Sequence, residues 1–451
     1  MPPEDGGRSV NDPLAGVPTE ALIYAAPLAL LLLCYFRARR SSERASLRAL
    51  ERSRETGLSE PVSLHPVIDR TVCMGCGACA RACPEGDVLG VVGGQAELVN
   101  PTHCIGHGAC QRACPTGAIS LAIGTETRGV EIPRLGPNFE TNVPGIFVAG
   151  ELGGMGLIRN AAEQGRRAVE AIRKLPGIGE GDRLDLVVVG AGPAGIAASL
   201  TALQHGLRFA TLEQDTLGGA IRHHPRGKVI VLHPVEFPLV GRVRMREMPK
   251  EELLRFFEAV CRDTGLRIRE RERVDHIRPE GDGFAVRSSS GWLATRAVLL
   301  AVGRRGTPRR LGVPGEELGK VVYRLAEPRQ YRGMRTLVVG GGNSALEAAI
   351  QLAEEAACTP TLAYRGRTFV RATRAHRDRV FELAAAGRID LRLETEVEAI
   401  EASRVRLRTP SGPLWLPNDA VVVCAGGVLP TDFLGRIGVE VEIRHGEPWV
   451  A

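Results

Sequence analysis

Apolar residues form one long N-terminal run and then recur in short strand-like segments that lead into glycine-rich turns. Residues 21–36 read ALIYAAPLALLLLCYF and carry no charge. A helix that starts at Leu14 is long enough to cross a hydrocarbon layer. Three arginines follow the run at once, and the tail before it is more acidic. The pattern therefore predicts a transmembrane helix over residues 14–36, preceded by a tail of residues 1–13.

The orientation of the predicted transmembrane helix follows from the same charges. Basic residues favour the cytoplasmic side, so we expect a single-pass protein of the inner (cytoplasmic) membrane with its later domains in the cytoplasm. Residues 37–60 are polar and predict a juxtamembrane helix or stalk. A buried core helix and an anchor that lies on the membrane surface are the alternatives.

Two further segments combine an apolar strand, a glycine-rich turn and a helix. The first reads LDLVVVGAGPAGIAASL from Leu184, and the second reads RTLVVGGGNSALEAAI from Arg335. A GxGxxG string alone is a weak signal, but between a strand and a helix it predicts binding of a dinucleotide pyrophosphate. The predicted cofactor-binding residues of the two turns are Gly190, Gly192, Gly195, Gly340, Gly342 and Ala345.

The residues that should contact the two riboses differ. Glu213 ends the strand after the first turn, where a carboxylate accepts hydrogen bonds from ribose hydroxyls. The equivalent strand of the second unit is followed by Arg365, Arg367 and Arg371 instead. Guanidinium groups there favour a ribose 2′-phosphate, so NADPH is preferred over NADH. A solvated basic loop is the alternative.

Cysteine is concentrated in one segment. Seven of the 11 cysteines lie between Cys73 and Cys114, in the strings CMGCGACARACP and CIGHGACQRACP. Both strings have the C-x2-C-x2-C-x3-C-P spacing of iron–sulfur proteins, with His107 in place of one cysteine. A zinc ribbon is the alternative, although its spacing normally differs. The predicted metal ligands are Cys73, Cys76, Cys79, Cys83, Cys104, His107, Cys110 and Cys114.

This segment resembles the bacterial two-cluster ferredoxins. In that family the fourth cysteine of each run ligates the other cluster. The resemblance therefore implies one 4Fe-4S cluster on Cys73, Cys76, Cys79 and Cys114, and a second cluster on Cys104, Cys110, Cys83 and the His107 position. Three states of the second cluster stay open: ligation by histidine, a 3Fe-4S cluster, or a four-iron cluster completed by water or hydroxide.

The remainder resembles the two-domain flavoproteins of the thioredoxin reductase type. That family normally ends with a PGIFVAGD-like signature that holds the FAD ribityl chain, whereas here PGIFVAGE precedes the first glycine turn. The resemblance implies a circular permutation, with Gly150 and Glu151 near the flavin and a helix that starts near residue 155. No C-x-x-C pair occurs after the iron–sulfur segment, so dithiol exchange has no apparent site.

Together these features predict an α/β fold with two Rossmann-type three-layer domains in permuted order, a small ferredoxin-like α+β module and an N-terminal transmembrane helix. The predicted parts are a tail (1–13), the transmembrane helix (14–36), a stalk (37–60), a two-cluster ferredoxin domain (61–128), a permuted FAD-domain segment (129–178), an FAD-binding domain (183–303), an NAD(P)H-binding domain (304–417) and a return segment of the FAD domain (418–451).

The expected function is an oxidoreductase that moves electrons between NADPH, FAD and two iron–sulfur clusters, with no catalytic side chain required. The expected partners are NAD(P)H and an electron-carrier protein or membrane redox partner. A redox sensor without sustained turnover is the alternative. The formal charge of +6 and 4% aromatic content give no reason to expect nucleic-acid binding. Direction of electron flow, acceptor and oligomeric state, including a homodimer, stay open.

Overall fold

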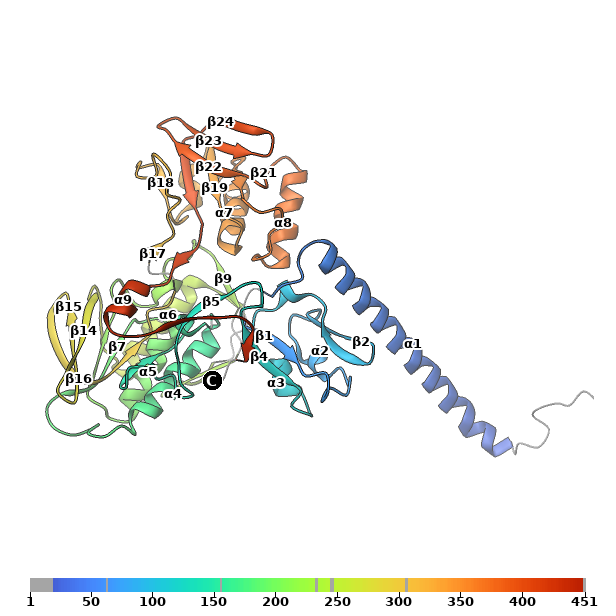
Figure 1. Ribbon diagram of the computed structural model, residues 1–451, viewed down its shortest axis with the longest axis horizontal. Helices are drawn as coiled ribbons and strands as arrows, with labels where there is room; N and C mark the ends of the chain where they lie inside the picture. Colours follow the sequence, from blue (N-terminus) through green and yellow to red (C-terminus); the bar gives the residue numbers. More distant parts are fainter. Residues whose placement is uncertain are drawn as a thin grey trace, which may run out of the picture.

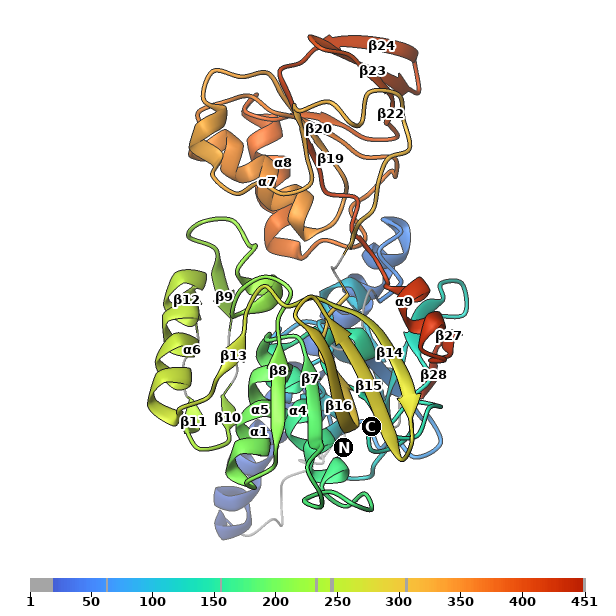
Figure 2. The ribbon, with the colours of Figure 1, turned by 90° about the vertical axis from the view of Figure 1, so that its left-hand side faces the viewer.

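The computed structural model describes residues 19–61, 64–154, 156–231, 234–243, 247–304 and 307–448. These residues form a long N-terminal helix, a small α+β module and two α/β domains (Figure 1). The helix projects from one side of the body. The second α/β domain lies above the first, and the small module lies beside the first (Figures 1 and 2). Two Rossmann-type sheets are present, which confirms the predicted α/β class.

Helix α1 (Thr19–Glu55) runs without interruption through Pro27. Large apolar side chains in its first half, from Ile23 to Phe36, are exposed. No helix among the described residues is long and apolar enough to cross a membrane. The predicted transmembrane helix over 14–36 is therefore not supported, and residues 14–18 of that prediction lie outside the described residues.

The second half of α1 packs against the small module. Glu43 accepts a hydrogen bond from the Gly93 amide at 2.8 Å. Gly90 faces Ser46 so closely that a Cβ on the glycine would lie 2.3 Å from the serine hydroxyl oxygen. The predicted stalk is therefore the continuation of α1, and its C-terminal part rests on the module.

The small module repeats one unit twice around a buried apolar core. Its three-stranded antiparallel sheet has the order β1-β4-β28. A hairpin and three short helical segments cover this sheet. The elements are β1 (His65–Ile68), α2 (Ala78–Ala82), β2 (Leu89–Val92), β3 (Gln95–Leu98), η1 (Pro101–His103), α3 (Ala109–Ala113), β4 (Ile119–Ile123) and β28 (Glu447–Pro448).

The first α/β domain has a seven-stranded sheet of order β13-β8-β7-β16-β15-β14, in which β6 also pairs with β16. Its strands are β6 (Ile146–Val148), β7 (Leu184–Val189), β8 (Phe209–Leu212), β13 (Ile268–Arg269), β14 (Val274–Glu280), β15 (Gly283–Ser288) and β16 (Gly291–Leu300). The surrounding elements are η2 (Glu151–Gly153), α4 (Ile158–Ile172), α5 (Pro193–Gln204), η3 (Gly219–Ile221), β9 (Val229–Val231), β10 (Val235–Phe237), β11 (Gly241–Val243), β12 (Glu247–Pro249) and α6 (Lys250–Thr264).

The segment before the first glycine turn is an integral part of this domain. Strand β6 pairs in parallel with the C-terminal half of β16, on the side of β16 opposite to β7. Helix α4 then packs directly on α5. A Cβ on Gly165 of α4 would lie 2.1 Å from the Ala194 carbonyl oxygen, so this close approach requires glycine.

The second α/β domain has a parallel sheet of order β18-β25-β19-β20-β21, with a separate antiparallel sheet of order β22-β23-β24. The elements are β18 (Val321–Val322), η4 (Pro328–Tyr331), β19 (Thr336–Val339), α7 (Asn343–Glu354), β20 (Thr361–Ala363), α8 (Arg374–Ala385), β21 (Asp390–Arg392), β22 (Glu396–Ile400), β23 (Arg404–Thr409), β24 (Gly412–Pro417) and β25 (Ala420–Val423). Because β25 lies inside this sheet, the domain extends past the predicted boundary at residue 417.

After β25 the chain returns through the first domain to the small module. The two domains are joined by β17 (Thr307–Pro308) and β26 (Gly427–Val428), which pair antiparallel. Helix α9 (Thr431–Arg436) follows on the first domain. Strand β27 (Val441–Arg444) then pairs with β5 (Val130–Pro133), and β28 pairs with β4. The small module is thus held by residues from both ends of the described chain.

The small module also contacts the second domain through α8. Arg374 forms an ion pair with Asp87 at 3.2 Å, and the Arg377 guanidinium lies 3.3 Å from Nε2 of His103. The other ring nitrogen of His103 lies 2.9 Å from Asp87. A helix of the second domain and the cysteine-rich module are therefore connected by a charged network.

We expect Asp185→Ala to destabilise the first domain by about 2 kcal/mol, since it removes several hydrogen bonds that a buried carboxylate accepts. Asp185 is 1% exposed and accepts from the amides of Gly179 at 2.7 Å and Arg208 at 2.8 Å. The Arg208 side chain is 36% exposed and can rehydrate, which limits the loss. Chemical denaturation should measure the change, and Asp263→Ala, at an exposed pair, should be nearly silent.

This difference should also depend on pH. Burial alone would raise the pKa of Asp185, but the Arg208 guanidinium and the backbone amides hold it below its usual value. A carboxylate with a lowered folded-state pKa stabilises the protein above the unfolded pKa of about 4, and this contribution disappears as pH falls through the folded-state value. A stability gap between the wild type and Asp185→Ala that stayed constant down to strongly acidic pH would contradict this assignment.

Candidate functional site

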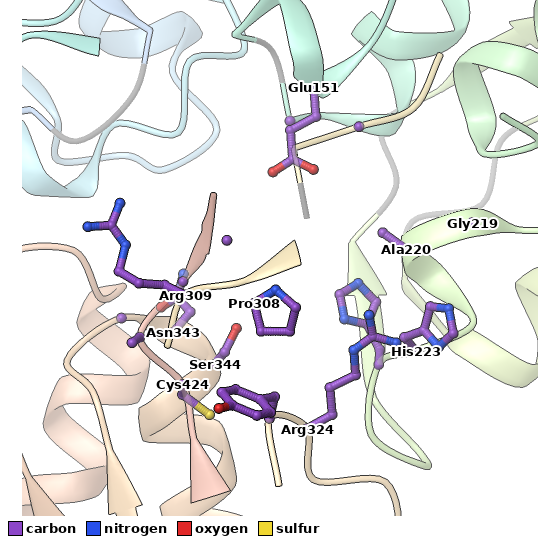
Figure 3. Close-up of a pocket in the computed structure, with 18 of the residues that line it drawn as sticks. Glu151, Gly219, Ala220, His223, Pro308, Arg309, Arg324, Asn343, Ser344 and Cys424 are labelled. Atoms are coloured by element: carbon purple, nitrogen blue, oxygen red, sulfur yellow. The ribbon is translucent and has the colours of Figure 1, made fainter. Parts of the chain in front are cut away.

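One large cavity lies between the two α/β domains. Its volume is about 2070 Å³, and the turns after β7 and β19 both open onto it. Figure 3 shows Glu151 pointing into this space, with Ser344 and Cys424 across from it and His223 and Arg324 on one flank. Both glycine motifs predicted from the sequence therefore face a common space of a size suited to large ligands.

The first glycine turn connects β7 to α5. Gly190 has φ of 108°, in the left-handed region that favours glycine. A Cβ on Gly195 would lie 1.8 Å from the Gly190 carbonyl oxygen, so helix and turn are in direct backbone contact there. Gly192 has nothing within 4 Å of the position that its Cβ would take. This open position at a helix N-terminus can receive a pyrophosphate.

Glu213 lies at the end of β8, beside this turn. Its carboxylate is 5% exposed and accepts hydrogen bonds from the amides of Ala191 at 2.7 Å and Asp215 at 3.0 Å. Glu213 also lines the cavity. The carboxylate is thus held rigidly next to the pyrophosphate position, where it can accept from ribose hydroxyls.

Gly150 and Glu151 follow β6 and reach the same cavity. Gly150 has φ of 84°, and its amide donates to the buried Gln164 side chain at 2.8 Å. Helix α4 begins at Ile158 rather than near residue 155, and residue 155 itself lies outside the described residues. Strand β6 therefore carries Glu151 to the cavity independently of the first glycine turn.

The second glycine turn connects β19 to α7. Gly340 has φ of 144°, and Gly342 has open space at its Cβ position. Ala345 is fully buried and packs 3.1 Å from the Cβ position of Gly340, so it serves close packing rather than direct contact with a ligand. The geometry again leaves room for a pyrophosphate at a helix N-terminus.

Only two of the three predicted arginines line the cavity. We call residues 364–373 the arginine loop. Arg365 and Arg371 line the cavity, whereas Arg367 points elsewhere and pairs with Glu394 at 2.6 Å. A backbone bridge between Arg371 and Gly342, and a 2.7 Å hydrogen bond from the Thr373 amide to the Asn343 side chain, fix the loop to the second turn. Two guanidiniums thus lie beside the second nucleotide position.

Several charged groups at the cavity were not among the predicted site residues. Arg309, Arg310 and Arg324 line it, as does His223. Burial and the neighbouring Arg324 lower the pKa of His223, which lies 2.9 Å from Asp215. The sequence signal for this histidine is the turn GGAIRHHPRGK. Only the tertiary fold brings Arg324 of the second domain next to it.

The two cysteine runs adopt matching backbones. Gly77 and Gly108 precede α2 and α3 with φ of 69° and 70°, and Cys83 and Cys114 end these helices with nearly equal dihedral angles. Cys73, Cys76 and Cys79 line a small cavity together with Cys114 from the other run. One thiol of the second run therefore lies with three thiols of the first.

The other four predicted ligands do not line this small cavity. They are Cys83, Cys104, His107 and Cys110. Nε2 of His107 lies 3.7 Å from the Cys83 sulfur, while Nδ1 accepts from the Ala109 amide at 3.1 Å. Burial raises the pKa of Cys104 to about 12 and that of Cys110 to about 11, so both thiols are protonated without metal. Cys83, Cys104 and Cys110 belong to the same buried core.

The described residues contain no group of three or more His, Cys, Asp or Glu side chains arranged for a single metal ion. An iron–sulfur cluster contains several irons and sulfides, so its cysteines stand farther apart than the ligands of one ion. Four thiols around one small cavity fit such a cluster by donor type. The open Cβ positions of Gly192 and Gly342 fit two dinucleotides.

Comparison with known proteins agrees with both parts of the chain. Residues 187–450 match the pyridine nucleotide-disulphide oxidoreductase family, and residues 65–115 match the 4Fe-4S dicluster domain. The bacillithiol disulfide reductase Bdr from Staphylococcus aureus has a similar fold, with a TM-score of 0.54 and 21% identity over 58% of this chain and 81% of that chain.

Several curated relatives have the name ferredoxin--NADP reductase. The protein from Thermus thermophilus is 31% identical over 58% of this chain and 78% of its own length. The protein from Ignicoccus hospitalis is 33% identical over 38% of this chain. This chain spans 54% of the length of the Ignicoccus relative.

Proposed function

Since the chain belongs to the pyridine nucleotide-disulphide oxidoreductase family and is an NAD(P)H-dependent oxidoreductase, we propose that it moves electrons between NADPH and an electron-carrier protein through FAD and two iron–sulfur clusters. The observation that supports this most strongly is one cavity that joins both glycine turns, in a chain that also carries the paired cysteine runs. When bound, FAD would supply the chemistry that converts two-electron hydride transfer into one-electron transfer.

The chain's own residues bind and orient these groups. At the first turn, Gly192 admits the FAD pyrophosphate, Glu213 accepts from the ribose, and Glu151 approaches from β6. At the second turn, Gly342 admits the nicotinamide dinucleotide, and Arg365 and Arg371 provide positive charge. No side chain needs to act as an acid or base in this transfer.

The permuted order is part of the same proposal. Strand β6 and helix α4 precede β7 in the chain, yet they pack beside β16 and α5. This is the position that the resemblance assigns to a C-terminal segment of the family. The permutation connects the cluster module to the flavin-binding strand by a short stretch of chain.

A disulfide acceptor is disfavoured by the remaining thiols. Cys358 is buried and its sulfur donates to the Tyr331 carbonyl at 2.9 Å. Burial raises the pKa of Cys261 to about 11, which makes it a poor nucleophile. Cys424 lines the cavity without a second cysteine at C-x-x-C spacing. We therefore propose a one-electron carrier as the partner.

An anaerobic titration with NADPH, followed by low-temperature EPR on iron-replete and FAD-loaded protein, tests the proposal. We expect signals of reduced clusters to appear as NADPH is added. Clusters that respond to dithionite but not to NADPH would contradict this direction of transfer and favour reduction by a ferredoxin or a sensing role. Localisation at the inner membrane stays a prediction, which fractionation of cell membranes can test.

We expect Arg365→Ala to weaken binding of NADP⁺ about tenfold to a hundredfold, because a charge-assisted hydrogen bond contributes roughly 1.5–3 kcal/mol. Binding of NAD⁺ should change little, since it lacks the 2′-phosphate. Arg367→Ala is the matched control, because this neighbour pairs with Glu394 outside the cavity. Equal losses in both variants would argue against a specific role for Arg365. Isothermal titration calorimetry measures both constants.

A further inference from the structure

Two turns outside the nucleotide domains border the arginine loop. The first follows α1 and comprises residues 57–61, and the second comprises residues 125–128, after β4. They are tied together, because Arg128 donates to the Pro61 carbonyl at 2.7 Å and Glu60 accepts from the hydroxyls of Thr125 and Thr127. We call this pair of turns the module edge.

The module edge reaches the cavity from the side of the cysteine-rich module. Gly57, Glu60 and Arg128 line the same cavity as Arg365 and Arg371. A Cβ on Gly57 would lie 4.0 Å from the Thr368 methyl group, so the backbone of Gly57 lies close to the arginine loop. The nucleotide side of the cavity is thus closed partly by residues outside the range that the family model matches, 187–450.

The charges at this contact are unbalanced. Burial and the nearby Arg371 both lower the pKa of Arg128, while Glu60 acts in the opposite direction. Within the described residues, Arg365 and Arg371 form no ion pair, in contrast to Arg367 with its Glu394 partner. Arg371 is close enough to Arg128 to disfavour its charge, and like charges at such a distance repel unless an anion lies between them. A phosphate group is the anion that such a fork of donors binds best.

We propose that Arg128 forms part of the phosphate-binding site for NADPH, together with Arg365 and Arg371. The inference rests on the proposed function, which supplies NADPH as the ligand. In this arrangement one phosphate group is held by the second α/β domain and by the cysteine-rich module at once. Nucleotide binding therefore fastens the two together, next to the existing contacts of Arg374 with Asp87 and of Arg377 with His103.

Two phosphate groups of NADPH could occupy this position. The backbone bridge between Arg371 and Gly342 lies beside the pyrophosphate position, whereas Arg365 follows the strand end where a ribose 2′-phosphate is expected. Only NADP⁺ carries the 2′-phosphate, and both NADP⁺ and NAD⁺ carry the pyrophosphate. Comparing the two ligands therefore identifies the group that Arg128 contacts.

The test is calorimetric titration of oxidised, FAD- and iron-loaded full-length Arg128→Ala with NADP⁺ and with NAD⁺. We expect roughly tenfold weaker binding of NADP⁺ and a smaller dependence of the binding constant on salt, because one charged contact is removed. Loss confined to NADP⁺ supports contact with the 2′-phosphate. Loss for both ligands supports contact with the pyrophosphate.

Matched variants distinguish phosphate recognition by Arg128 from a purely structural role of its side chain. Arg128→Lys keeps the charge and should recover most of the affinity, whereas Arg128→Gln keeps an N–H donor without charge and should not. Arg70→Ala, on the module but paired with Glu97 away from the cavity, should bind as the wild type does. If Arg128→Ala cannot be loaded with FAD and iron, the affinities of Arg128→Lys and Arg128→Gln for NADP⁺ are compared with that of the wild type instead.

Unchanged NADP⁺ binding in Arg128→Ala, together with weakened binding in Arg365→Ala, would overturn the inference and leave the proposed function intact. Weakened binding that lysine fails to restore and that keeps the wild-type salt dependence would also overturn it, since it indicates a structural role for the Pro61 contact. Failure of the unmodified protein to bind NADP⁺ would instead refute the proposed function.

Discussion

Gly195→Ala should yield a protein that purifies with little or no FAD. The added methyl group would lie 1.8 Å from the Gly190 carbonyl oxygen, and this neighbour is backbone rather than a flexible side chain. Either the turn or α5 must move, and the pyrophosphate position moves with it. A cost of about 3 kcal/mol, at the upper end for overpacking, corresponds to roughly a hundredfold loss of affinity.

Release of flavin from denatured protein, measured by fluorescence against protein concentration, checks this expectation. Gly435→Ala is a suitable control because nothing lies within 4 Å of the new methyl group on α9. The second turn already carries an alanine, Ala345, at the equivalent place. Full FAD content in Gly195→Ala would mean that the first turn tolerates the same residue and that the backbone contact is not limiting.

Cys114→Ser should remove the same cluster that Cys76→Ser removes. Both thiols line one cavity although they belong to different cysteine runs, so a crossed ligand set predicts a shared phenotype. Each variant should lose about half of the iron, because one of two clusters loses a ligand. The remaining EPR signal should be the same in the two proteins after reduction with dithionite.

Cys110→Ser provides the comparison for the other cluster. If the ligands were grouped by sequence run, Cys114→Ser would resemble Cys110→Ser instead, because these two cysteines belong to the second run. Identical spectra for Cys114→Ser and Cys110→Ser would therefore rule out the crossed arrangement. His107→Cys adds a fourth thiol beside Cys83, and its spectrum reports whether the histidine position is within reach of the second cluster.

The parts of the site that were predictable from sequence are those in which spacing determines local geometry. A glycine-rich turn between a strand and a helix has a characteristic local geometry, so Gly190, Gly192, Gly340 and Gly342 could be placed on two turns, both of which line the cavity. The cysteine runs are similar, since Gly77 and Gly108 set up two short helices by local backbone preference alone.

Other features depend on contacts between distant segments, and spacing holds no information about them. Arg367 and Arg371 look equivalent in sequence, but Arg367 pairs with Glu394, on the bend after β21, and does not line the cavity. The contacts of Arg374 and Arg377 with the module were not predictable for the same reason. The apolar composition of the run before Arg37 predicted a transmembrane helix. In the structure this run and the polar segment after it form one continuous helix, and composition alone does not indicate that continuity.

Strand β28 has a consequence for how the protein is made. It pairs with β4 at the edge of the cysteine-rich module, although it follows both α/β domains in the chain. Ribosomes synthesise the N-terminal cysteine runs first, and domains tend to fold as they emerge. This module, however, cannot complete its sheet until β28 has left the ribosome. Its cysteines are therefore translated long before their surroundings are complete, and the sheet of this module closes only after both α/β domains have been synthesised.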